Sequence, residues 1–141
     1  MSFDWLTLDG VNWIGVLVAF VATFALGWFW YSNAGFFPMW KKAGNITDEQ
    51  IRSANMGVAF GGTTLATLLG VVLLAILMHA TGATSVAGGA ALGAILGLVF
   101  KGGAHAGHNG FALRAPRITV IDAAADTVGL ALAGVILGLF N

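Results

Sequence analysis

The chain has 141 residues, of which 58% are hydrophobic and 9% are charged, with a mean hydropathy of +0.89. A soluble domain carries about a quarter charged residues, so this composition excludes an ordinary water-soluble fold. The net charge is zero and cysteine is absent, which excludes a basic nucleic-acid-binding surface, disulfides and thiolate chemistry.

The first predicted membrane span covers residues 11–31, which contain no charged side chain. About 20 apolar residues suffice to cross a bilayer. Trp5 and Trp13 lie at its start, and an interfacial aromatic box lies at its end: Trp28, Trp30, Tyr31 and Trp40. Trp and Tyr favour both headgroup regions, so the two groups are expected at the two membrane interfaces. No Lys or Arg precedes Lys41, so we expect no cleaved signal peptide.

A polar loop over about 32–56 separates the first span from the second. Within it, Thr47 and Gln50 frame an acidic pair and predict a capping box at the start of a helix. From Arg52 to Lys101 there is no formal charge, a stretch of about 70 Å as one helix, more than twice the bilayer core. The chain must therefore turn once, at the polar stretch 79–85, which places the second span at about 57–78.

The third and fourth spans are predicted at about 86–110 and 118–140, joined by a loop at 111–117. The two loops at 32–56 and 111–117 hold the loop cations Lys41, Lys42, Arg52, Arg114 and Arg117. Short loops rich in Lys and Arg face the cytoplasm. The sequence therefore predicts an all-α integral membrane bundle of four transmembrane helices, a single domain over 1–141, with both termini on the non-cytoplasmic side.

Charged residues within the last two spans predict a buried polar cluster. The uncharged stretches 86–100 and 127–140 are too short to cross alone, so Lys101 and Asp126 must lie at membrane depth, where charged groups face the protein interior and pair. Residues four apart share a helix face. We therefore predict a ladder in which Lys101 pairs with Asp126, and His105 pairs with Asp122. His108 lies beside this stripe.

Small residues recur at intervals of four or five along the last two spans: Gly89, Gly93, Gly97, Gly129, Gly134 and Gly138. Such stripes allow helix backbones to approach closely. The neighbouring helix belongs either to the same chain or to another subunit. In the second case the protein would form a homo-oligomer or be part of a larger membrane complex.

Several segments resemble the bacterial membrane family of domain of unknown function 1761. They include Asn12-Trp13, the Gly-Trp-Phe-Trp-Tyr-Ser stretch at 27–32, the turn at 80–83 and the glycine-rich ending at 129–138. The resemblance implies a four-helix protein of the bacterial inner membrane with no known activity. The chain departs from the family pattern at Ala125-Asp126, where members often carry an aromatic residue and a His.

Three functions remain open for such a protein. It is expected to be a structural or accessory subunit that packs through its helix faces, in contact with membrane lipids and not with nucleic acid. Alternatively, it is a small proton, ion or solute transporter that uses the cluster of Lys101, His105, Asp122 and Asp126. The third alternative is a metal- or pigment-binding protein, with His105 and His108 as weak metal candidates. We predict no catalytic residue and no cofactor, and we expect a bound lipid.

Overall fold

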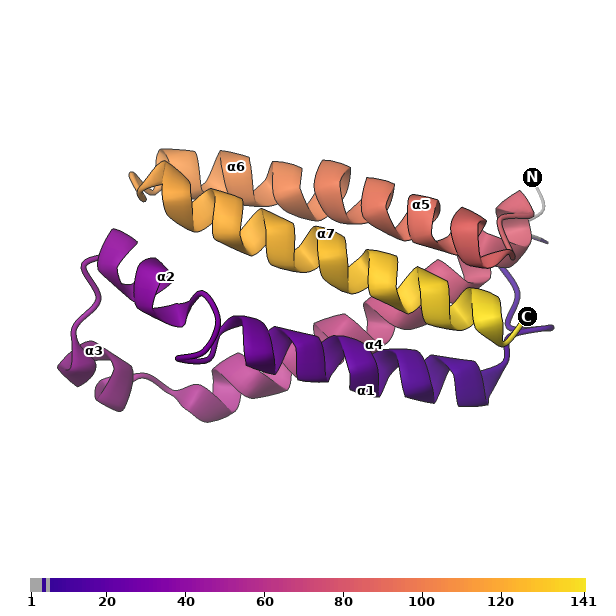
Figure 1. Cartoon of the computed structure of the whole chain (residues 1–141), viewed down its shortest axis with the longest axis horizontal. Helices are drawn as coiled ribbons and strands as arrows, with labels where there is room; N and C mark the ends of the chain where they lie inside the picture. The colour runs from indigo at the N-terminus through magenta and orange to yellow at the C-terminus, as the bar shows by residue number, and fades with distance from the viewer. Residues whose placement is uncertain (1–3, 5) are drawn as a thin grey trace.

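The computed structural model describes Asp4 and residues 6–141, so Trp5 lies outside the described residues. The described chain is all-helical, which confirms the predicted fold class (Figure 1). Four helices are long and apolar enough to cross a membrane: α1 (Trp13–Trp30), α4 (Met56–Thr81), the continuous helix Val86–Phe111 and α7 (Pro116–Leu139). The side of the membrane that each terminus faces stays a prediction.

The continuous helix has three segments, and two short helices lie in the first long loop. The segments are α5 (Val86–Leu96), the π-helical η1 (Gly97–Gly102) and α6 (Gly103–Phe111), and the short helices are α2 (Phe37–Ala43) and α3 (Asp48–Ser53). The predicted capping box is present at α3, where the Thr47 hydroxyl accepts from the Gln50 N–H and the Gln50 side chain accepts from the Thr47 N–H. Helix α4 ends at Gly82, whose φ of 73° is a left-handed conformation that suits glycine.

The glycine stripes pack within the chain. Helix α5 lies along α7 (Figure 1), and a Cβ atom added at Gly89 would collide with the Gly134 backbone. At Gly93 it would collide with the Leu130 carbonyl group, and at Gly97 with the backbone of Asp126 and Thr127. Glycine is therefore what permits the contact between these two helices, as the spacing predicted.

The hydrophobic core occupies the half of the molecule that holds the start of α1, the end of α7 and the α4–α5 turn, here called the joined end (Figure 1). The largest fully buried side chains of this core are Leu74, Met78 and Val71, all from the second half of α4. The start of α1 is fastened to the end of α7, because the Asn12 side chain donates to the Phe140 carbonyl at 3.0 Å. Packing and hydrogen bonding thus hold all four long helices together here.

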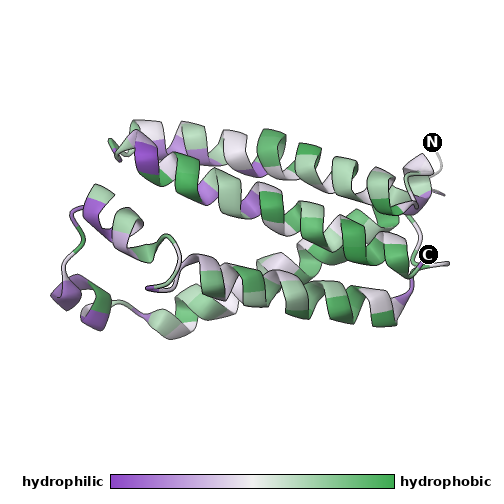
Figure 2. Cartoon of the chain, in the orientation of Figure 1, coloured by the Kyte–Doolittle hydropathy of each residue, from purple (hydrophilic) through white to green (hydrophobic). Residues whose placement is uncertain are grey.

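The opposite half, here called the open end, holds α2, α3 and the α6–α7 turn. The first half of α4, residues 57–69, is mostly exposed and runs away from α7 toward α3 (Figure 1). Hydrophilic residues concentrate on α3 and on the stretches of α6 and α7 near this end (Figure 2). The four long helices are therefore close together at the joined end, whereas α4 departs from the others toward the open end, and a cavity lies between α1, α4 and α7.

Candidate ligand-binding site

The site is built around one carboxylate, Asp126, on α7. Lys101 donates from Nζ to its Oδ1 at 2.5 Å, and His105 Nε2 lies 2.8 Å from its Oδ2. With Asp126 ionised, the His105 Nε2 atom carries the hydrogen of this bond. Each carboxylate oxygen thus has a donor, about 15 Å along α7 from its first residue. The ion pair between Lys101 and Asp126 agrees with the pairing expected from helical spacing.

The second rung of the predicted ladder is wrong, because His105 pairs with Asp126 and not with Asp122. The reason is the tilt of side chains along a helix. Each Cα–Cβ bond leans toward the N-terminus of its own helix. Since α6 and α7 are antiparallel, His105 leans toward the level of Asp126, while Asp122 leans away from it toward the α6–α7 turn. Matching Cα heights alone did not take this tilt into account.

Asp122 instead binds the aromatic box. The hydroxyl of Tyr31, one residue beyond the end of α1, donates to Asp122 Oδ1 at 2.6 Å. Burial, together with this hydrogen bond and the carboxylate charges, raises the pKa of Tyr31 well above its ordinary value near 10. Tyr31 therefore remains a protonated donor, and it joins α1 to α7 at the open end.

The η1 segment gives Lys101 a special backbone position. Residues 97–102 form a π-helical turn between α5 and α6, and such turns are rare and concentrate at functional sites. Gly97 packs on α7 at the start of the turn, and Gly102 and Gly103 follow Lys101. The sequence does not reveal this turn, since glycines at these positions equally suit close α-helical packing.

The aromatic box divides into an outward part and an inward part. Trp28 is 75% exposed, as an interfacial anchor requires. Trp30 packs on Phe36 with ring centroids 4.6 Å apart, and Tyr31 meets Trp40 edge-on at 6.2 Å. The indole N–H groups of Trp30 and Trp40 are buried without an acceptor among the described residues. An acceptor atom on a bound ligand would satisfy either of them.

The ionic cluster and the inward part of the box line the same cavity, of about 880 Å³. Helices α1, α4 and α7 form most of its walls, with α2 and the loop before α4 at the open end. Its polar lining residues include Tyr31, Lys101, His105, Asp122 and Asp126. This volume lies within the ~300–1,000 Å³ of pockets that hold drug-sized ligands. A mostly apolar cavity with a few converging polar groups is the usual form of a small-molecule site.

His108 stands apart from this cluster. It is exposed, and its neighbour Asn109 is the residue that turns inward, donating to the Thr119 hydroxyl at 3.2 Å. Across the described residues, no group of three His, Asp or Glu side chains is placed to hold a metal ion. The structure thus gives no support to a joint metal site of His105 and His108.

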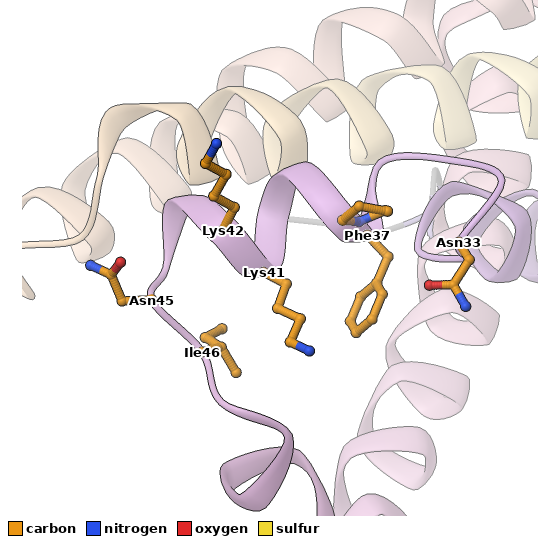
Figure 3. Close-up of a pocket in the computed structure, with 7 residues that line it drawn as sticks. Asn33, Phe37, Lys41, Lys42, Asn45 and Ile46 are labelled. Carbon is orange, nitrogen blue, oxygen red and sulfur yellow. The ribbon is translucent and has the colours of Figure 1, made fainter.

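A second, shallower pocket of about 440 Å³ lies beside α2 (Figure 3). Lys41 points between Ile46 and Phe37, whereas Lys42 points away on the other side of α2 (Figure 3). Lys41 donates to Asp48 at 2.5 Å, so its charge is already paired with the start of α3. This ion pair links α2 to α3, and none of the residues of the ionic cluster lines the pocket.

Comparison with known proteins agrees with the resemblance seen in the sequence. A family model described as "Protein of unknown function (DUF1761)" matches residues 14–138, nearly the whole of the helical bundle. Neither the curated proteins nor the solved structures give a match to the chain. Because that match covers most of its length, the chain belongs to the DUF1761 family.

Proposed function

We propose that this protein is a small transporter of the bacterial inner membrane, and that its solute binds in the cavity between α1, α4 and α7. The loops 32–56 and 111–117, which hold the loop cations, would face the cytoplasm. The observation that carries the proposal is that Lys101, His105, Asp122 and Asp126 all line that one cavity. Ionisable groups within a membrane typically mark a solute or ion pathway when they face such a cavity.

The exposure of the ion pair favours transport over a purely structural role. The Lys101 side chain is 43% exposed and that of Asp126 is 25% exposed. A cluster that merely joined α6 to α7 in an accessory subunit needs no open space beside it, whereas Lys101 and Asp126 both border the cavity. The open cavity instead leaves room for a solute beside the charges.

The absence of cysteine from the chain makes access to the cavity directly measurable. Ala125 lines the cavity beside Asp126, whereas Ala133, two turns further along α7, is fully buried in the core. Ala125→Cys and Ala133→Cys are matched variants with the same small change in side chain. Each is reconstituted in vesicles and treated with a small membrane-impermeant thiol reagent, from either side separately.

A transporter must expose its site to both sides in turn, so Ala125→Cys should react from either side and Ala133→Cys from neither. Reaction of Ala125→Cys from one side alone would overturn transport and indicate a binding protein. A lack of reaction from both sides, with a normal melting curve, would overturn it in favour of an accessory subunit with a closed, dry cluster.

A further inference from the structure

The charges around the cavity do not balance. Lys101 supplies one positive charge, while Asp122 and Asp126 supply two negative ones. With a neutral His105, the cavity therefore carries one net negative charge at membrane depth. An uncompensated charge in a region of low dielectric constant is costly, and a cation that binds beside it relieves that cost.

The unbalanced charge can be assigned to Asp122. Both Lys101 and His105 are engaged by Asp126. Within Asp4 and residues 6–141, no Lys, Arg or His lies within 4.0 Å of an Asp122 oxygen; its partner is the Tyr31 hydroxyl, which binds Oδ1. A hydrogen bond from a neutral donor stabilises the charged form of a carboxylate but does not cancel its charge, so Asp122 can still attract a cation.

The wall near Asp122 is aromatic. Seven aromatic residues of α1, α2, α4 and the turn after α1 line the cavity: Phe24, Trp28, Trp30, Tyr31, Phe37, Trp40 and Phe60. Aromatic faces attract cations, and Trp and Tyr do so most strongly when water is excluded. The same rings accept apolar substituents, whereas a small hydrated metal ion would gain little from them.

Resting on the proposed function, we propose that the solute is a lipophilic organic cation, bound with its charge against Asp122 and its apolar groups among the aromatic residues of α1, α2 and α4. The ion pair of Lys101 with Asp126 lies deeper along α7 and limits the excess negative charge to a single unit. That arrangement selects monovalent cations. The apolar surface of the cavity selects those with hydrophobic substituents.

The test uses two ions of nearly the same size and shape and of opposite charge, tetraphenylphosphonium and tetraphenylborate. Binding of each to the purified protein in lipid nanodiscs is measured by calorimetry, with protein-free nanodiscs to correct for partition into lipid. Asp122→Asn removes the proposed charge while keeping the shape of the side chain. Glu49→Gln, on exposed α3 and outside the cavity, is the matched control.

The wild-type protein and Glu49→Gln should bind tetraphenylphosphonium alike, and Asp122→Asn should bind it at least about tenfold more weakly. Tetraphenylborate should bind no better than to protein-free nanodiscs. Equal binding of both ions, no binding to folded wild type, or full affinity in Asp122→Asn would each overturn the inference. If Ala125→Cys nevertheless reacts from both sides, the transporter stands and only the solute class is refuted.

Discussion

Gly93 offers a test of the packing that supports the site. A Cβ atom at this position would collide with the carbonyl group of Leu130 and approach the Ala131 nitrogen. These are backbone atoms, so no side-chain rotation relieves the overlap, and α5 must separate from α7. Overpacking of this kind costs about 1–3 kcal/mol, while replacing a helical glycine by alanine returns at most about 1 kcal/mol.

We therefore expect Gly93→Ala to lower the free energy of unfolding by about 1–2 kcal/mol, and Gly93→Leu to lower it further. The matched control is Gly107→Ala on α6, where a Cβ atom meets nothing within 4 Å and should be neutral or slightly stabilising. Unfolding in detergent, followed by circular dichroism, measures both variants. If Gly93→Ala were as stable as Gly107→Ala, the close contact between α5 and α7 would be refuted.

Two further predictions concern the cluster. Asp126→Ala leaves Lys101 unpaired, which costs about 3–5 kcal/mol of stability in a fully buried pair. Because Lys101 is 43% exposed, we expect the free energy of unfolding to fall by about 1–3 kcal/mol and to be partly restored by Lys101→Met in the same chain. Thermal unfolding that is unchanged in Asp126→Ala, or effects that simply add in the double variant, would contradict the pairing. Tyr31 is the single tyrosine, so tyrosinate absorbance reports it alone. Since burial and Asp122 raise its pKa in the folded protein, no tyrosinate should form near pH 10. The free energy of unfolding should be unaffected below that pH and should fall above it, and Asp122→Asn should lower the titration midpoint of Tyr31. Titration near pH 10 in the folded protein would refute the buried hydrogen bond.

Local patterns predicted what depends on one helix or on two adjacent ones. The spans follow from runs of uncharged residues, the capping box from Thr47 and Gln50, and the pairing of Lys101 with Asp126 from their similar distance to one short turn. These features require no knowledge of how distant helices are rotated. For the same reason, the glycine stripes of two antiparallel neighbours could be recognised as contact surfaces.

The features that were missed depend on distant contacts. The hydrogen bond from Tyr31 to Asp122 joins α1 to α7, and helical periodicity does not reveal how these two helices face each other. The error at His105 came from ignoring side-chain tilt, which a sequence argument can include. The cavity could not be predicted, because it arises where α4 departs from the bundle. Most residues along that stretch are apolar, and apolar residues suit a surface that faces lipid as well as one that faces a cavity.

The unequal fastening of the two ends has a mechanical consequence. At the joined end, Gly89 lies against Gly134 and a hydrophobic core fills the space between the helices. At the open end, α1 is tied to α7 by the Tyr31–Asp122 hydrogen bond, and the Thr23–Gly129 hydrogen bond joins the same two helices near their middle. A force that spreads the helices should therefore move them least at the joined end and most at the open end. We therefore expect a change in the lateral pressure of the surrounding lipid to change the width of the cavity.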